Sequence, residues 1–269
     1  MKLRIVVPFV LVALISLWSC TSKEKPAEKK APDDLIAYKV TNIFPHDRTA
    51  FTQGLVIHSG RLFESTGQFG TSWISEVNIA TGVQDKKVIL DKKYFGEGIT
   101  ILNNKIYQLT YQTKIGFVYD WRTFNKLAEF NYDYEGWGIT HDGKNLIVSD
   151  GTDKLHILDT VTLKDIQTLN VKNHGVKRDS LNELEYIEGY VYANIWLTNT
   201  IVKIDPANGE VVGQMDLSKM GEEVRAKDPQ ADVLNGIAYE KKSKTILITG
   251  KQWPACYAIR FAEAKKQEK

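Results

Sequence analysis

The sequence has few of the residues and motifs that mark common catalytic chemistries. It contains two cysteines, Cys20 and Cys256, with no CxxC pair, and its five histidines do not show the spacing H-x-x-x-H. A transition-metal site is therefore not indicated. The sequence also lacks G-x-S-x-G, the P-loop and G-x-G-x-x-G. Serine hydrolase, nucleotide and dinucleotide chemistry are thus unsupported.

The chain also lacks an excess of charge of either sign. Its 35 lysines and arginines are balanced by 33 aspartates and glutamates, which gives a formal net charge of +2. This balance indicates neither nucleic acid nor an acidic surface as a partner.

What the sequence does contain is a repeated glycine motif. In Phe95-Gly96-Glu97-Gly98, two glycines flank a carboxylate before a strand-like apolar run. Glycine lets the backbone turn sharply and lets another group approach closely, so we expect Glu97 to be presented where a strand begins. The same motif recurs four more times, as Gln53-Gly54, Trp137-Gly138, Asn182-Glu183 and Asn235-Gly236. In Asn182-Glu183 the glycine is replaced by glutamate.

The length of the repeat predicts the fold. The second residues of the motif, at positions 54, 98, 138, 183 and 236, are 44, 40, 45 and 53 residues apart. Four short strands in about 40–45 residues make one propeller blade, so we predict an all-β fold, a five-bladed β-propeller. The innermost strands of such a ring begin around its axis. The first residues of the motif should therefore meet at one mouth of the channel: Gln53, Glu97, Trp137, Asn182 and Asn235.

Two segments lie outside the repeats. Residues 35–44 alternate between apolar and polar, and we expect this strand to pair with residues 256–261 and so complete the last blade without exposed edges. Residues 217–233 have sparse apolar residues among many charged ones. They predict a short helix and loop inserted at a channel mouth, which accounts for the longest spacing.

The first 20 residues predict export and a lipid anchor. A short basic start precedes an apolar run over residues 5–17, which is too short to span a bilayer and is typical of a secretory signal. Leu17-Trp18-Ser19-Cys20 resembles the end of a bacterial lipoprotein signal, so Cys20 would become the lipidated N-terminus of the mature protein. The alternative is an ordinary cleaved signal with an incidental cysteine.

The rest of the chain then divides into three parts. Residues 21–34 are rich in lysine, contain two prolines and predict a flexible tether. Residues 35–261 are expected to form one propeller domain, and residues 262–269 a charged tail. Because lipidation would occupy Cys20, Cys256 would have no disulfide partner, and stability would depend on the core and on ring closure. We expect a monomer held at the bacterial cell envelope, on its periplasmic or outer-surface face.

The residues expected around the axis have the chemistry of a small polar pocket. Glu97 is a potential acid or base, and Lys251 is a potential proton donor or cation. Aromatic walls and neutral hydrogen-bonding groups would surround them: Tyr111, Trp137, Trp196, Gln53, Asn182 and Asn235. A carboxyl beside aromatic surface has a raised pKa, which suits proton transfer near neutral pH. The structural alternatives are a turn carboxylate, core aromatics and a solvated lysine.

Seven segments, in order along the chain, carry a resemblance to a known family. They are Phe51–Leu55, Phe95–Thr100, Glu135–Thr140, Leu181–Tyr186, Ala193–Trp196, Leu234–Ala238 and Thr249–Pro254. Together they resemble the glutaminyl-peptide cyclotransferases of plants and bacteria. That family is a five-bladed propeller unrelated to the zinc-dependent animal enzymes.

The resemblance implies cyclisation of the N-terminal glutamine of a peptide or protein to pyroglutamate, with loss of ammonia. Carried over by motif, Glu97 is the general acid/base, while Lys251 and Asn182 hold or polarise the amide oxygen. The substrate would be bound by Phe51, Gln53, Phe95, Tyr111, Trp137, Trp196 and Asn235. Tyr111 stands where the family is expected to have tryptophan, which bears on affinity or selectivity more than on catalysis. No cofactor and no catalytic metal are implied, although a structural cation in the channel stays open.

Two other functions are compatible with the same fold, because a fold alone does not assign a function. One is a non-catalytic propeller lipoprotein that binds peptides or envelope components. The other is a propeller hydrolase or lactonase, which would need a cluster of metal ligands at the axis. Glu97 and Lys251 together favour the cyclotransferase, since a binding module needs neither proton transfer nor a partner for an oxyanion.

Overall fold

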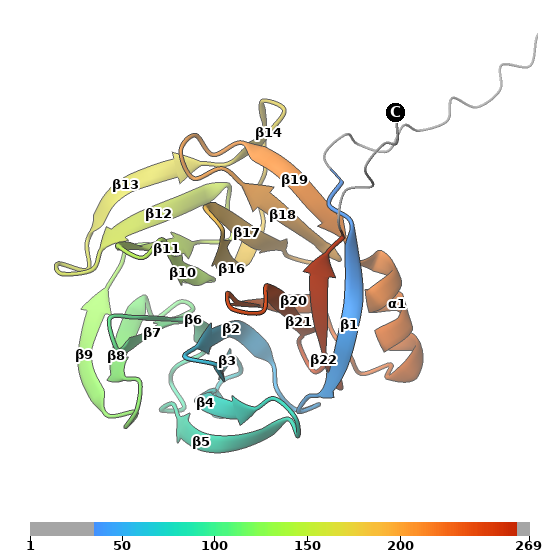
Figure 1. The fold of residues 1–269 in the computed structure, drawn as a ribbon. Helices are drawn as coiled ribbons and strands as arrows, with labels where there is room; N and C mark the ends of the chain where they lie inside the picture. Colours follow the sequence, from blue (N-terminus) through green and yellow to red (C-terminus); the bar gives the residue numbers. More distant parts are fainter. Residues whose placement is uncertain (1–34, 263–269) are drawn as a thin grey trace, which may run out of the picture. The chain divides into compact units, whose positions relative to one another are not determined.

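The structure, a computed structural model, describes residues 35–262, and these form a ring of five antiparallel four-stranded sheets around a central axis (Figure 1). The predicted five-bladed β-propeller is confirmed. Blade 1 consists of β2 (Thr52–His58), β3 (Arg61–Thr66), β4 (Trp73–Asn78) and β5 (Val83–Ile89). Blade 2 consists of β6 (Gly96–Leu102), β7 (Lys105–Thr110), β8 (Ile115–Asp120) and β9 (Lys126–Asn131). Blade 3 consists of β10 (Ile139–His141), β11 (Asn145–Ser149), β12 (Lys154–Asp159) and β13 (Asp165–Asn170).

The last two blades include the ring closure. Blade 4 consists of β16 (Leu181–Ile187), β17 (Tyr190–Ile195), β18 (Thr200–Ile204) and β19 (Val211–Asp216). Blade 5 consists of β20 (Leu234–Glu240), β21 (Thr245–Gly250), β22 (Ala255–Phe261) and the first strand of the domain, β1 (Tyr38–Pro45). A small hairpin between blades 3 and 4, formed by β14 (Lys172–Asn173) and β15 (Val176–Lys177), was not predicted.

The core of the domain lies between neighbouring blades. All seven residues of the inner strand β6 are buried, whereas the outermost strand β9 is exposed at five of its six positions. In the described domain there is one cluster of buried apolar side chains at each of the five interfaces between blades. At the interface of blades 1 and 2, for example, Phe63 and Ile74 pack with Ile106 and Phe117. Burial of apolar surface therefore fixes each blade against its neighbours.

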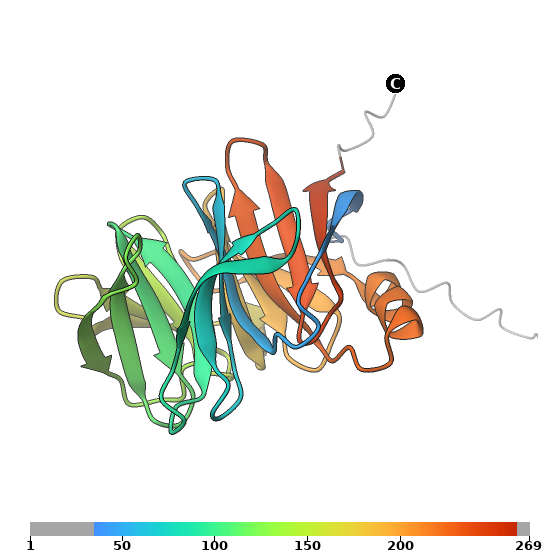
Figure 2. The same ribbon diagram turned by 90° about the horizontal axis from the view of Figure 1, so that it is seen from below.

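The expected closure of the ring is confirmed. β1 pairs antiparallel with β22, from Tyr38 opposite Phe261 to Pro45 opposite Ala255. The two strands come from opposite ends of the domain and lie side by side in Figures 1 and 2. The last blade is thus completed by the first strand, which leaves the ring closed.

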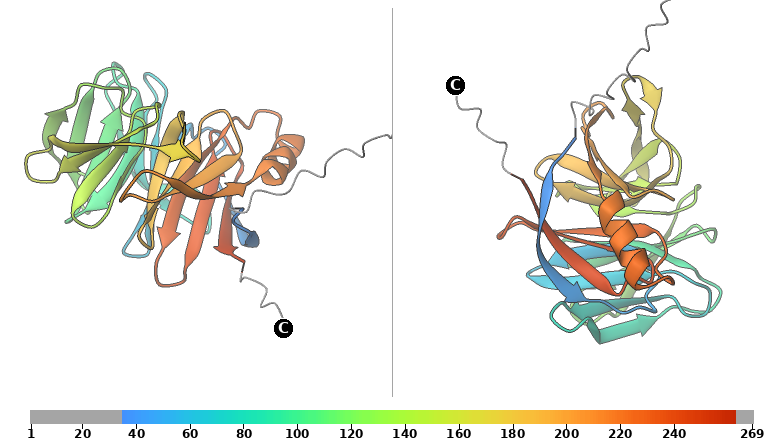
Figure 3. Two further views of the ribbon diagram at one scale, coloured as in Figure 1. Left: turned by 90° about the horizontal axis from the view of Figure 1, so that it is seen from above. Right: turned by 90° about the vertical axis from the view of Figure 1, so that its right-hand side faces the viewer.

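The expected helix is also present, but not where it was placed. α1 (Ser218–Lys227) buries Met220 and Val224 in the apolar cluster of blades 4 and 5. It lies on the outer side of the ring (Figure 3) rather than at a channel mouth. Only the loop after it reaches the mouth, through Asp232 and Val233. The prediction was wrong on this point because the buried face of the helix packs on the outer strands.

Several predictions fall on residues that the structure does not describe. The signal ending at Cys20, the tether at 21–34 and all but the first residue of the charged tail lie outside residues 35–262. Within that range, no helix is long and apolar enough to cross a membrane. Cys256 is buried in β22.

Candidate active site

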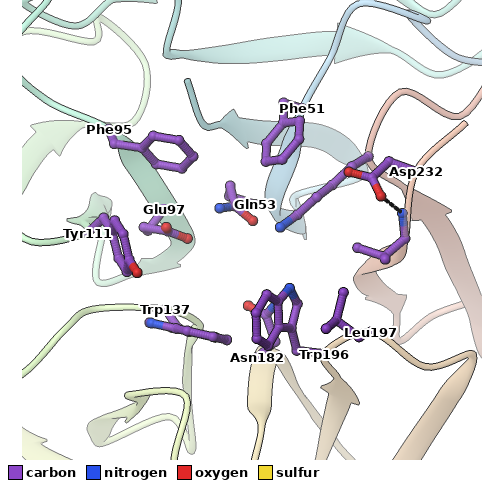
Figure 4. A pocket seen from close by; sticks show the side chains of 12 residues that line it. Phe51, Gln53, Phe95, Glu97, Tyr111, Trp137, Asn182, Trp196, Leu197 and Asp232 are labelled. Carbon is purple, nitrogen blue, oxygen red and sulfur yellow. Dashed lines mark hydrogen bonds between the residues drawn. The ribbon is translucent and has the colours of Figure 1, made fainter. Parts of the chain in front are cut away.

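A cavity of about 270 Å³ opens at one end of the central axis (Figure 4). Its walls come from all five blades: Phe51, Gln53, Phe95, Glu97, Tyr111, Trp137, Asn182, Trp196, Leu197, Asp232, Val233 and Lys251. The size is at the small end of ligand sites, which commonly measure about 300–1,000 Å³. The cavity thus fits one amino-acid side chain better than an extended ligand.

Glycines bring the first strands of the blades into contact around the axis. A Cβ atom on Gly54 would lie 2.5 Å from the backbone nitrogen of Ile99, and one on Gly98 would lie 2.9 Å from the Cα of Gly138. A Cβ on Gly138 would clash with the carbonyl oxygen of Asn182. Only glycine permits this approach, so the residue before each glycine is held at the rim of the axis.

Side chains from the second strands hold these first residues in place. Ser65 Oγ donates to the carbonyl oxygen of Glu97 at 2.5 Å and accepts from Gln108 Nε2 at 2.9 Å. In blades 3 and 4, Ser149 Oγ donates to the carbonyl oxygen of Asn182 at 2.6 Å. The backbones that carry Glu97 and Asn182 are therefore fixed by buried hydrogen bonds.

Glu97 and Lys251 are buried together in this cavity, at 4% and 5% exposure. Burial raises the pKa of Glu97 well above its usual range. The charge on Lys251 and a hydrogen bond from Gln53 oppose the rise, and Glu135 adds to it. Burial lowers the pKa of Lys251, against the attraction of Glu97 and Asp232. The two pKa values shift toward each other because burial disfavours the charged form of each group, a pattern common among groups that transfer protons.

Aromatic side chains form a continuous arc around the pair. Successive ring centroids from Phe51 to Phe95, Tyr111, Trp137 and Trp196 are 6.2, 5.9, 6.5 and 5.4 Å apart. Most of these pairs meet edge to face, a favourable arrangement for aromatic rings. The arc supplies an apolar wall that raises the cost of a charge inside the cavity.

Three amide side chains were predicted at the site, and two of them line the cavity. Asn182 Oδ1 is buried and has no hydrogen-bond partner among residues 35–262. Asn235 does not line the cavity. It is fully buried, and its Nδ2 donates to Gln53 Oε1 at 3.2 Å and to the carbonyl oxygen of Thr52 at 3.0 Å. Asn235 thus orients the Gln53 amide, with its nitrogen free to face Glu97.

Sequence reasoning missed three lining residues, Leu197, Asp232 and Val233. The last two pair with Lys251, since Asp232 N donates to Lys251 O and Lys251 N donates to Val233 O, both at 2.9 Å. This pairing extends the β20–β21 hairpin, in which Leu234 is opposite Gly250. The hairpin register was therefore the signal that could have placed both residues at the site.

Among residues 35–262 no group of three or more histidines, cysteines, aspartates or glutamates is arranged to hold a metal ion.

Comparisons with known proteins find relatives of this chain by sequence and by structure. Residues 11–261 match the family model described as glutamine cyclotransferase. The chain is 40% identical over 225 residues to a glutaminyl-peptide cyclotransferase of Arabidopsis thaliana, which covers 82% of this chain and 70% of that protein. It also resembles the crystal structure of Myxococcus xanthus glutaminyl cyclase, with a TM-score of 0.79 and 33% identity over 84% of this chain and 97% of that one.

Proposed function

Since the chain belongs to the glutamine cyclotransferase family, we propose that it converts the N-terminal glutamine of peptides or proteins to pyroglutamate and releases ammonia. One observation carries the proposal: a carboxyl of raised pKa and a lysine of lowered pKa are buried in a single small cavity. Peptide binding alone does not require such a pair, which is costly to bury.

The reaction joins two atoms of the same residue. The α-amino nitrogen attacks the carbonyl carbon of the side-chain amide, a C–N bond forms, and the amide nitrogen leaves as ammonia. Because attacker and target are already linked, the enzyme must fold the side chain back on itself and move protons. The small cavity and its aromatic arc support the first task, since the cavity is about the size of one side chain and has apolar walls.

Glu97 performs the second task in this proposal. Its carboxylate accepts a proton from the α-ammonium group, which frees the nitrogen lone pair for attack, and returns a proton to the departing ammonia. The attacking nitrogen loses a second proton after the C–N bond forms, and this proton leaves with the ammonia as ammonium. A raised pKa supports this role, because it makes the carboxylate a stronger base toward the α-ammonium group. The contact with Gln53 keeps the carboxyl aimed into the cavity.

Lys251 and Asn182 stabilise the oxygen of the attacked amide as it gains negative charge. A single donor aimed at such an oxygen contributes about 3 kcal/mol. The unpartnered atom of the Asn182 amide is Oδ1, an acceptor that is available to an N–H group of the substrate, while the proposed contact with the amide oxygen would be made by Nδ2 of the same side chain. Trp196 is 41% exposed and Leu197 is 65% exposed, so the rim they form is available to the next residue of the peptide.

The test is ammonia release from a glutamine-led dipeptide by the purified protein, with pyroglutamate measured in parallel. We expect equal amounts of both products, and we expect turnover to persist when a chelator is added, because no step proposed here uses a metal. Folded protein that releases no ammonia from several such peptides would overturn the proposal in favour of a peptide-binding propeller. Turnover lost with chelator would overturn the metal-free mechanism alone.

We also propose that the protein is anchored to the cell envelope through Cys20. The proposal rests on the signal-like residues 1–20 and on the basic tether that follows them. In a bacterial host, the wild-type protein should partition with membranes and Cys20→Ser should not. Equal partition of the two would contradict the lipid anchor.

A further inference from the structure

A buried histidine–glutamate pair lies behind the cavity, where blade 1 meets blade 5. His46 directly follows β1 and Glu64 lies in β3, and their side chains are 3% and 1% exposed. His46 Nε2 lies 3.1 Å from Glu64 Oε1, and His46 Nδ1 lies 2.8 Å from the carbonyl oxygen of Trp253. Both ring nitrogens face acceptors, and only a doubly protonated ring can donate to both.

The surroundings favour this charged form. Burial opposes a positive charge on His46, but the Glu64 carboxylate and the Trp253 carbonyl outweigh it, so the pKa of His46 is raised. Glu64 Oε1 also accepts a hydrogen bond from Thr52 Oγ1 at 2.7 Å. The other groups facing the pair are Asp47, Thr249 and Cys256.

One side of the pair holds the turn that follows Lys251. The backbone nitrogen of His46 donates to the carbonyl oxygen of Pro254 at 3.1 Å, so His46 contacts two successive carbonyls of this turn. Trp253 is fully buried, and its Nε1 donates to the carbonyl oxygen of Asp232 at 2.9 Å. Asp232 in turn pairs with Lys251. The backbone at Lys251 is therefore held by its pairing with Asp232 and by the contacts of His46 with the turn that follows it.

The other side of the pair holds the residue before Gln53. Thr52 donates its hydroxyl to Glu64, and its carbonyl oxygen accepts from Asn235. Gln53 then faces Glu97. A single buried pair thus connects the segment that carries Lys251 with the segment that orients the catalytic carboxyl.

We propose that the His46–Glu64 pair is a positioning device that holds Lys251 and Gln53 in register across the interface of blades 1 and 5. The inference deepens the proposed function and rests on it. Neither residue of the pair lines the cavity, so both act through the segments that they hold. Loss of the pair should misplace Lys251 and lower the rate of reaction more than the affinity for substrate, because placement of catalytic groups governs the chemical step.

The test compares His46→Gln with a matched control, His156→Gln. His156 Nε2 lies 3.0 Å from Asp150 Oδ2 in blade 3, so it too is a histidine in a buried pair with a carboxylate. Its ring stacks on Tyr134, with the ring centroids 3.7 Å apart, and neither His156 nor Tyr134 lines the cavity. A purely structural role predicts that both variants lose thermal stability and that folded molecules of both keep their turnover.

We expect His46→Gln to lower kcat by about tenfold, with KM changed by less than about twofold, while His156→Gln keeps kcat. The acid limb of the pH–rate profile should also move to higher pH in His46→Gln, since a displaced Lys251 no longer lowers the pKa of Glu97. Unchanged kcat and an unchanged profile in folded His46→Gln would overturn the inference. Should this variant fail to fold, Glu64→Gln provides the same comparison.

A second readout does not depend on turnover. Lys251 is 5% exposed, so reductive methylation followed by mass spectrometry should label it slowly in the wild-type protein and in His156→Gln. Labelling should accelerate in His46→Gln. Equal labelling in all three proteins would overturn the inference even if the wild type proved inactive, whereas an inactive wild type by itself would overturn only the proposed function.

Discussion

The mouth and the interior of the propeller channel each contain a buried carboxyl, and the two differ in what their oxygens contact. Glu97 faces the cavity, beside Lys251. Glu183 Oε1 accepts from the backbone nitrogen of Leu55 at 3.2 Å, and its Oε2 accepts from that of Ile237 at 2.9 Å. Burial raises the pKa of both groups well above the usual range.

The difference shows that burial and a raised pKa do not by themselves identify a catalytic group. Glu183 occupies the position that is glycine in the other four repeats, and its two hydrogen bonds join blade 4 to blades 1 and 5. Its oxygens are already used by the protein, whereas the Glu97 carboxyl is directed at space that a ligand can enter. Available hydrogen-bonding capacity in a cavity is the property that separates them.

The largest expected effect is on turnover. If the two substitutions lowered turnover equally, the distinction between Glu97 and Glu183 would not hold. Glu97→Gln should lower kcat by about 10²–10⁴-fold, the usual contribution of a general acid/base. Glu183→Gln should keep kcat within about threefold for the folded fraction. Steady-state ammonia release from a glutamine-led dipeptide measures both, with circular dichroism to establish folding. Losses of equal size would remove the catalytic assignment of Glu97.

The free energy of unfolding should respond in the opposite order, with Glu183→Gln lowering it more than Glu97→Gln does. An amide has only one acceptor oxygen, so Glu183→Gln leaves the nitrogen of Leu55 or of Ile237 facing a donor and should cost about 1–3 kcal/mol. Glu97→Gln removes a poorly compensated buried acid and should leave the unfolding free energy unchanged or higher. Chemical denaturation of both variants measures the difference. A more stable Glu183→Gln would show that the two hydrogen bonds are not a net stabilising feature.

A smaller effect is expected from the aromatic wall of the mouth. Tyr111 lies between Phe95 and Trp137 in the arc, at 5.9 and 6.5 Å. Tyr111→Trp should lower KM by about two- to tenfold through closer aromatic contact, worth about 0.5–1.5 kcal/mol, with kcat little changed. Initial-rate kinetics over a range of dipeptide concentrations would decide it. A change confined to kcat would mean that this wall positions catalytic groups rather than substrate.

The smallest effect is a shift of the pH profile. The charge of Glu135 contributes to the raised pKa of Glu97, so Glu135→Gln should lower that pKa. More Glu97 would then be ionised at a given acidic pH, and the acid limb of kcat/KM should move to lower pH. The same substitution should leave the pKa of Glu183 alone, because Glu185 is the carboxylate that acts on it. A shift toward higher pH would contradict the sign of the interaction.

The repeat pattern was sufficient to predict the blades, because the glycine positions recur at the length of one blade. It also placed Gln53, Glu97, Trp137 and Asn182 together, since the first residue of each motif lies where an inner strand begins. Asn235 occupies the same position but lies beneath Gln53. Its place depends on how side chains pack in three dimensions, which the repeat does not encode.

Other features depend on contacts between distant parts of the chain. Leu55 and Glu183 are 128 residues apart, and no local pattern shows that their groups meet. The position of α1 was mispredicted for a related reason. Its buried residues, Met220 and Val224, indicate that one face is covered but not which blade covers it. The predicted signal and lipid anchor fall on residues that the structure does not describe, and they stay predictions.

Closure of the ring determines when during folding the domain becomes complete. Thr41 in β1 hydrogen bonds to the carbonyl oxygen of Ala258 in β22, 217 residues away. Contacts of such long sequence separation form late and slowly in folding. His46 directly follows β1, so it reaches the turn after Lys251 only when this last contact is made. A chain released before its final strand emerges therefore has no assembled site, and the proposed activity would begin only with the finished molecule.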